Sequence, residues 1–386
     1  MMDTQNAVMA GGLTLLRHLS HERHVTAEEL AAGLGGKTAD VKRLLGELEA
    51  RRLVRLDKAR KAWSLNPDFG CLIGIDMGAS HLHFALTDFA GEVLEEADQK
   101  IRPEDGPERL IGQIKRQSRL LANKPARHRL RGLAIGVPSP VNPRTGLVSF
   151  ANNLPGWTNV DLKGELEREF RIPVVLENDA NMAAVGEHWR GVAQAAEHFI
   201  FIAIGTGIGS GIFISGELYR GRTGEAGELY RLHLEWPRWN EDFGENGYFE
   251  SHASGQGIAA LGRRLMGRNG VAKNLAEERD AYFVFEAFRA GQPQARQTLE
   301  TIFTILAVGI ANVAAVLDPD LVVLGGGVTK GAPEFMLATI EKVARKIQPQ
   351  LPPVRLSALE DKAQTFGAVF SAMNAAWQSA LARRRG

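Results

Sequence analysis

Carboxylate and amide side chains gather in one short segment, Glu177-Asn178-Asp179-Ala180-Asn181. It follows the apolar run 173–176 and precedes a helical pattern, so Asn178 and Asp179 are expected at a strand end beside a helix N-terminus, where ligands collect in open α/β sheets. Amides and carboxylates suit a polyhydroxylated ligand, and Asp179 could act as a general base toward a hydroxyl. The alternative is a cluster that only caps the helix, because Asn and Asp favour that position.

Glycine-rich loops form the second group of residues that could take part in binding or catalysis. Four such stretches adjoin strand-like runs, at 73–80, 204–211, 221–228 and 321–327. Glycine lets backbone N–H groups approach an anion closely, and an acid can hold a metal–phosphate group. A single loop of this kind marks only a tight turn, whereas several in one chain favour a nucleotide-type cleft. The candidate loop residues are Asp76, Gly78, Gly205, Thr206, Gly207, Gly209, Gly325 and Gly326.

The N-terminal segment has the pattern of a winged helix-turn-helix. A helix is expected within 6–19, and a second begins at Thr26, where Glu29 completes a capping box. A third begins near Thr38 and carries one apolar stripe at helical spacing. Two strand-like runs, 53–56 and 62–65, then enclose a charged turn that would form the wing.

Positive charge is concentrated in this segment, although the whole chain has a net charge of only +1. Residues 42–62 contain eight basic and three acidic residues, and contacts to DNA phosphates need such a local surplus. A recognition helix in the major groove and a wing along the backbone would use it. The alternative is a protein–protein module with a solvated basic face. The candidate DNA contacts are Lys37, Thr38, Lys42, Arg43, Lys58 and Arg60.

Two regions are needed to position these groups. A domain boundary is expected at Asn66-Pro67-Asp68-Phe69-Gly70, because these residue types favour turns. Residues 1–66 form the DNA-binding domain, and residues 71–386 alternate short β-rich runs with glycine loops and amphipathic helices, which predicts an α/β domain. A length of 386 residues is sufficient for both.

Composition excludes several classes of protein. A single cysteine, Cys71, excludes a disulfide framework and a multi-cysteine zinc site. No apolar run reaches the ~18 residues that would span a membrane, and no secretory signal pattern opens the chain. We therefore expect a cytoplasmic protein without a membrane partner.

Together these segments resemble the ROK family (repressors, open reading frames and kinases) over roughly residues 71–380. The resemblance implies a two-lobed fold of the actin/hexokinase type, here behind a winged helix-turn-helix that is typical of the family's repressors of the xylose and N-acetylglucosamine type. It places Asp179 at the catalytic base of the family's kinases and Asn153, Asn178, Asp179, Glu228 and Glu250 at the sugar. The segments that carry it are Asp76-x-Gly78, 205–211, 153–157, 177–181 and 318–327.

The family's zinc motif is lost. Its members usually bind zinc through one His and three Cys, and Arg231, Glu241, Phe243 and Tyr248 stand at those positions here. Arginine cannot ligate zinc because it stays protonated. We expect no zinc, with packing of Phe243 and Tyr248 in its place.

The first phosphate loop also departs from the family pattern of Gly-Gly-Thr followed by Lys or Asn. Here it reads Gly78-Ala79-Ser80-His81. Ala79 adds a Cβ where backbone must approach phosphate, and His81 replaces a residue near the γ-phosphate. Both changes weaken the case for a kinase.

These features favour a sugar-responsive transcriptional regulator, with repression as the expected sign. It would bind operator DNA as a homodimer or homotetramer and take a sugar or sugar phosphate as effector. The alternative is an ATP-dependent sugar kinase with a fused DNA-binding head, for which ATP and magnesium would be needed. Arg231 could pair with a phosphate or carboxylate of the effector, or form a salt bridge to Glu228 or Glu250.

Overall fold

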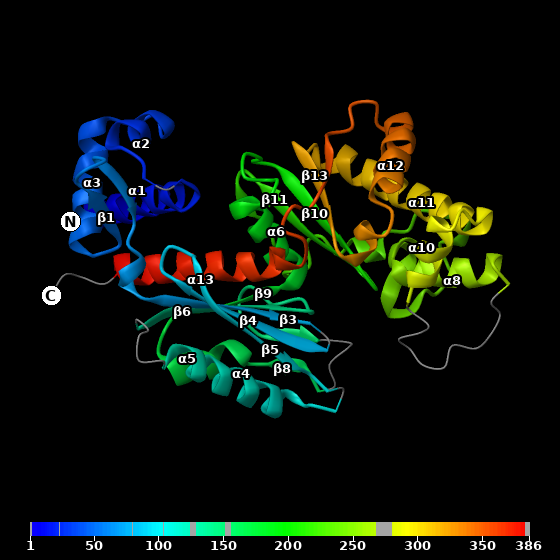
Figure 1. Ribbon diagram of the computed structural model, residues 1–386, viewed down its shortest axis with the longest axis horizontal. Coiled ribbons are helices and arrows are strands. Elements are labelled where there is room, and N and C mark those ends of the chain that lie inside the picture. Colours follow the sequence, from blue (N-terminus) through cyan, green and yellow to red (C-terminus); the bar gives the residue numbers. More distant parts are fainter. Residues whose placement is uncertain are drawn as a thin grey trace. The chain divides into compact units, whose positions relative to one another are not determined.

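The computed structural model describes residues 2–22, 24–78, 80–102, 104–123, 129–150, 156–267 and 280–382. Its chain divides into two compact units, Met1–Arg190 with Gln364–Gly386, and Gly191–Ala363. Asn153, Ala79 and the tail 383–386 lie outside the described residues. Each unit is described by itself below, with the element labels of Figure 1.

The first unit begins with three helices and a two-stranded wing (blue in Figure 1). They are α1 (Met2–His21), α2 (Ala27–Gly33), α3 (Thr38–Ala50), β1 (Val54–Asp57) and β2 (Ala62–Leu65), with β1 and β2 antiparallel. The capping box between Thr26 and Glu29 starts α2 as predicted. An isolated antiparallel bridge joins Val25 to Trp63 of β2, which the sequence pattern did not reveal. These elements form a winged helix, hereafter the head.

A five-stranded sheet follows in the same unit, in the order β5-β4-β3-β6-β9. Figure 1 shows α4 and α5 along one face and α13 along the other, where α6 also packs. The strands are β3 (Cys71–Met77), β4 (His81–Asp88), β5 (Val93–Lys100), β6 (Leu130–Val137) and β9 (Val174–Asn178). The helices are α4 (Pro107–Ala122), α5 (Leu162–Phe170), α6 (Asp179–Arg190) and α13 (Ala363–Ala382), and a small hairpin joins β7 (Val148–Phe150) to β8 (Thr158–Val160). We call this sheet with its helices the N-terminal lobe.

The second unit is built on another five-stranded sheet, in the order β12-β11-β10-β13-β14. Its strands are β10 (Phe199–Ile204), β11 (Ile208–Ile214), β12 (Glu217–Leu218), β13 (Leu321–Gly325) and β14 (Val354–Leu356). Its helices are α7 (Gly247–Ala253), α8 (Gly255–Leu265), α10 (Tyr282–Arg289), α11 (Pro293–Leu317) and α12 (Pro333–Ile347). The glycine loops at 205–207 and 326–327 directly follow β10 and β13, as the strand-to-loop pattern predicted.

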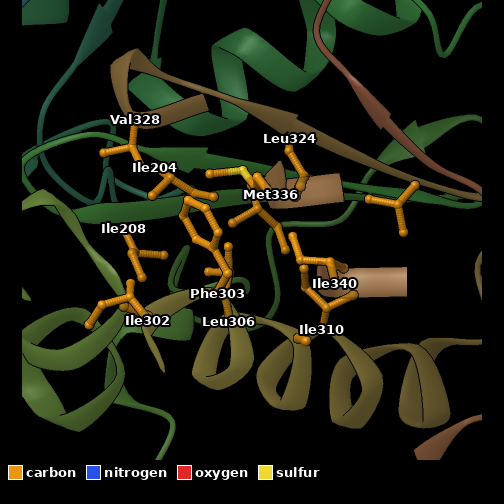
Figure 2. Packing of buried hydrophobic residues seen from close by; sticks show 14 of the residues in the cluster. Ile204, Ile208, Ile302, Phe303, Leu306, Ile310, Leu324, Val328, Met336 and Ile340 are labelled. Carbon is orange, nitrogen blue, oxygen red and sulfur yellow. The ribbon is translucent and has the colours of Figure 1, made fainter. Parts of the chain in front are cut away.

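Helix α11 forms the centre of the second unit's core. Figure 2 shows Phe303, Leu306 and Ile310 of this helix facing Ile204 and Leu324 of the sheet, all of them buried. Among the described helices α11 alone is long and apolar enough to cross a membrane, but most of its most apolar window is buried in this core. Its apolar character is therefore explained by packing in the core.

Candidate functional site

The polar segment 177–181 lies where β9 meets α6, as predicted. Asn178 Oδ1 accepts hydrogen bonds from the backbone N–H groups of Ala180 (3.0 Å) and Asn181 (3.1 Å), so this side chain caps α6. Asp179 Oδ1 accepts a hydrogen bond from the Ala180 N–H at 2.7 Å. The capping interpretation thus accounts for Asn178, while Asp179 carries the negative charge at the start of the helix.

Glu177 and Asn181 hold the junction of β9 and α6 (residues 177–181) in place; we call this junction the polar corner. Both are buried, and Asn181 Nδ2 donates to Glu177 Oε1 at 3.0 Å. The same Oε1 accepts from the Asn178 backbone N–H at 3.0 Å. Because both side chains are held by these bonds, the backbone that carries Asn178 and Asp179 is rigid.

The carboxyl group of Asp179 is electrostatically unusual. Burial raises its pKa to about 6, and repulsion from the nearby Asp76 adds to this effect. Asp76 lies on β3, opposite Gly136 of β6, which in turn lies opposite Glu177 of β9. A carboxylate with a pKa near neutral pH is a competent proton acceptor and a strong hydrogen-bond acceptor for a hydroxyl.

At the predicted first phosphate loop, a side chain of the same chain covers the glycine. The Gly78 N–H donates to the His81 carbonyl at 2.9 Å. A Cβ added to Gly78 would lie 2.4 Å from Cε1 of His81, so the imidazole lies directly against this glycine. A ligand that approached Gly78 from this side would have to displace the His81 ring.

His83 is a polar residue of this edge that the sequence analysis missed. Across the sheet it pairs with Asp76 on one side and with Asp98 on the other. Its Nδ1 lies 2.8 Å from Asp98 Oδ1, and its Nε2 lies 3.5 Å from Glu96 Oε1. Strand alternation places His83 and Asp76 on one face, but this becomes evident only once the register is known.

In the second unit, Glu250 supports the second phosphate loop. Its Oε2 accepts the Ile208 backbone N–H at 2.7 Å, and the Gly205 N–H closes the turn on the Gly207 carbonyl at 2.9 Å. A Cβ on Gly207 would lie 2.4 Å from that carboxylate oxygen, which explains the glycine. Thr206 at the loop tip is exposed, and Gly209 continues into β11 opposite Ala203.

The glycines after β13 permit a close approach of two strands. A Cβ on Gly325 would lie 2.6 Å from the Phe201 ring. Gly326 has a φ of +88°, and a Cβ there would lie 2.5 Å from the Ile204 carbonyl oxygen. Packing within the second unit is therefore sufficient to explain both residues.

Glu228 and Arg231 lie on the short 3-10 helix Leu229–Arg231 and its N-cap. The backbone is fixed just before it, because Ser210 Oγ donates to the Gly227 carbonyl. Arg231 Nε donates to the Tyr230 hydroxyl at 2.7 Å, and its guanidinium forms an ion pair with Glu225 at 3.6 Å. The sequence analysis offered Glu228 or Glu250 as the salt-bridge partner of Arg231, whereas the ion pair forms with Glu225.

An aromatic cluster stands at the position of the family's zinc site. Tyr248 is sandwiched between His233 (ring centroids 4.8 Å apart) and His252 (4.3 Å), and Phe243 meets all three rings edge-on. Arg238 covers Phe243 and pairs with Glu235 and Glu241. Within the described ranges no group of His, Cys, Asp and Glu could hold a metal ion, so these residues do not fit zinc.

Ion pairs reduce the free positive charge of the head's third helix. Lys42 pairs with Glu28 at 2.8 Å, and Arg43 pairs with Glu47 at 3.2 Å. Lys37 is the N-cap residue of this helix, and Thr38 is its first residue.

The wing is also basic. Lys58, Arg60 and Lys61 are exposed at its turn, and Asp57 shapes the turn by accepting the backbone N–H groups of Ala59 and Arg60. Arg51, which contributed to the basic surplus, instead donates to the Ala380 carbonyl of α13 at 3.0 Å. Arg60 also lies 3.7 Å from Asp57, so the wing turn keeps a basic surplus through Lys58, Arg60 and Lys61 against one acid.

Comparisons with known proteins indicate the family and the fold of this chain. The ROK family model matches residues 72–374. A glucokinase from Halalkalibacterium halodurans is 32% identical over 67% of this chain and 80% of its own length. A xylose repressor from Caldicellulosiruptor bescii is 26% identical over 79% of this chain and 78% of its own length. The structure of a ROK family transcriptional regulator, a homolog of the E. coli MLC protein, covers 97% of this chain and 98% of its own with a TM-score of 0.82 at 21% identity, a likeness of fold.

Proposed function

Because the chain belongs to the ROK family, we propose that it is a sugar-responsive transcriptional regulator, with repression as the expected sign. The observation that carries this proposal is a winged helix with an exposed basic wing on the same chain as the polar corner at Asp179. The likeness to a xylose repressor and to the fold of a transcriptional regulator supports it.

On the DNA side, the head would place α3 in the major groove and the wing along the phosphate backbone. Lys58, Arg60 and Lys61 would contact phosphates, and Lys37, Thr38, Lys42 and Arg43 would lie at or near the groove. A homodimer or homotetramer would present two heads to an operator with matching two-fold symmetry.

On the sugar side, Asp179, Glu228 and Glu250 would supply carboxylate oxygens of the kind that hold hydroxyl groups, and Asn178 would supply its amide NH2 group, because its Oδ1 caps α6. Asn153 and Arg231 belong to the same proposed set, Arg231 for an effector with a phosphate or carboxylate group. The effector must bind the DNA-competent and DNA-free states with different affinity. About 1.4 kcal/mol of coupling is enough for a tenfold change in operator affinity.

Two measurements on the full chain test this proposal. Selection of binding sequences from a random duplex library should enrich one motif, and a thermal-shift panel of neutral sugars, sugar acids and sugar phosphates should yield a stabilising ligand. Absence of any enriched motif would argue against a regulator. If only neutral sugars stabilise the protein, the proposed role of Arg231 toward a charged group is wrong.

The second candidate function is an ATP-dependent sugar kinase with a fused head. The raised pKa of Asp179, about 6, favours it because a kinase base must accept a hydroxyl proton. His81 over Gly78 counts against it. A coupled assay with ATP, Mg²⁺ and a sugar panel separates the two functions. Turnover that is lost in Asp179→Asn would establish the kinase, and the regulator predicts no turnover above background.

A further inference from the structure

The head and the N-terminal lobe share one hydrophobic core. Leu15 and Leu16 of α1 and Leu45 of α3 belong to the same buried cluster as Val369 and Trp377 of α13. At Gly12 of α1, a Cβ would lie 3.5 Å from both Leu381 of α13 and Leu48 of α3, so the three helices meet there. A domain on a free tether would instead bury its apolar residues by itself.

The connection between head and lobe is packed as well. The ring centroids of Phe69 and Phe89 lie 4.6 Å apart. The Arg131 guanidinium lies over the Phe69 ring, 4.1 Å from its centroid. Arg131 Nε also donates to the Phe69 carbonyl at 2.9 Å. Asn66 is tied back to the head, because its Nδ2 donates to the Arg52 carbonyl at 2.8 Å.

Two helices of the lobe reach from the polar corner to the head. Helix α6 begins at Asp179 and ends beside α1, where Trp189 Nε1 donates to the Ser20 carbonyl at 3.2 Å. Helix α13 begins near the same corner, where Gln364 Nε2 donates to the carbonyl of Gly136 at 3.2 Å.

The far end of α13 holds the head at two further points. Asn374 Oδ1 accepts from Arg17 Nε at 3.3 Å, and the Ala380 carbonyl accepts from Arg51. The two helices are also locked together, since a Cβ on Gly367 would lie 1.7 Å from the Met182 carbonyl oxygen.

We propose that the head is a fixed part of the N-terminal lobe, held by α6 and α13, so that the DNA-binding surface moves with that lobe. Trp189 is the central contact. It is 1% exposed, stacks on Phe370 with ring centroids 5.3 Å apart, and reaches α1 through its indole N–H. This proposal has a consequence that rests on the proposed function: the effector regulates DNA binding by moving the lobe that carries the head.

Hydrogen–deuterium exchange of the full chain, with Trp189→Phe and Trp157→Phe as a matched pair, tests the fixed head. Trp157 is equally buried, but it lies in the core on the other face of the sheet, and its indole N–H has no partner in the described part of the chain. Loss of the bond from Trp189 to Ser20 should speed exchange in α1 and the wing about five- to tenfold and leave β3 and β6 unchanged. Trp157→Phe should leave the head unchanged.

A second variant protects the test against a failure to fold. Arg51→Ala removes the partly buried hydrogen bond to the Ala380 carbonyl and should speed exchange in the same head segments. Head exchange that is unchanged in both Trp189→Phe and Arg51→Ala, or equally fast in Trp157→Phe, would overturn the fixed head.

The same experiment separates the fixed head from the proposed function. With D-xylose and D-glucose as probes, a sugar that protects residues 174–182 should also change exchange at residues 14–21, and Trp189→Phe should abolish that remote response. A sugar that protects the corner but leaves the wild-type head unchanged overturns the transmission. If neither sugar protects the corner, the result counts against the proposed function alone, because the variants have already decided the attachment of the head.

Discussion

At the scale of single residues, the most informative group is the Asp179 carboxyl. Partial burial and the neighbouring Asp76 raise its pKa to about 6, from an ordinary value of 3.8. A raised pKa in an acid means that the folded protein holds the proton more tightly than the unfolded chain does. The ionised carboxylate therefore destabilises the free protein above pH 6, a cost that a hydroxyl-bearing ligand can offset.

Asp179→Asn should consequently stabilise the ligand-free protein. The gain should be complete above about pH 6 and reach up to about 3 kcal/mol, because each pKa unit corresponds to 1.36 kcal/mol. It should shrink as the pH falls from 6 and be small at pH 4, because Asp179 is then protonated in the folded protein and only partly ionised in the unfolded chain. Denaturant unfolding at pH 8, 6 and 4 measures this difference. Equal stability of the two proteins at pH 8 would contradict the account.

The charge balance of α3 is also set by single residues. Glu28 and Lys42 are both well exposed and pair at 2.8 Å, so the acid occupies one of the proposed DNA contacts. Glu28→Gln should strengthen binding to non-specific duplex DNA at low salt, and the gain should fade as salt rises. Fluorescence anisotropy over a salt series measures it. Glu334→Gln, on α12 in the second unit, makes the same change in net charge and should have no such effect.

At the scale of elements, aromatic packing holds residues 233 and 243 against α7. His233, Tyr248 and His252 form a stack, and Phe243 meets these rings edge-on. Edge-on and offset aromatic pairs contribute about 0.5–1.5 kcal/mol each beyond their buried area. Packing of Phe243 and Tyr248 was predicted, whereas His233 and His252 were not.

Tyr248→Leu should therefore lower the free energy of unfolding by about 2–4 kcal/mol, since it removes both stacks and leaves a void. Tyr248→Phe keeps the rings and should cost less. A chelator should leave the melting temperature of the wild-type protein unchanged. A fall in melting temperature on addition of the chelator, reversed by Zn²⁺, would refute the replacement of the metal.

Local signals in the sequence located most elements but not their partners. The capping box at Thr26 and the glycines after β3, β10 and β13 could be predicted, because each depends on residues that are close together in the sequence. The Val25–Trp63 bridge and the row joining Asp76, His83 and Asp98 were not visible, because strand register depends on residues far apart in the chain. The candidate site residues were proposed from residue type and spacing, which say nothing of their hydrogen-bond partners.

At the scale of the whole molecule, a winged-helix head precedes a domain of the ROK family. The shared core of head and N-terminal lobe provides a physical connection between the head and the proposed effector-binding residues of that lobe. Turn residues predicted a domain boundary near residue 66, whereas the contacts group the head with the N-terminal lobe in one compact unit. The packing of Phe69, Arg131 and Trp189 between head and lobe could not be predicted, because those contacts join distant segments.

The most direct test of the central claim is a linkage measurement at fixed salt. The affinity of the full chain for its selected duplex is measured with and without the stabilising sugar, and the affinity for the sugar is measured with and without the duplex. A sugar-responsive regulator requires both affinities to change by the same factor, which we expect to be about tenfold or more. If the sugar and the duplex each bind with an affinity that the other does not alter, the protein is not a sugar-responsive regulator.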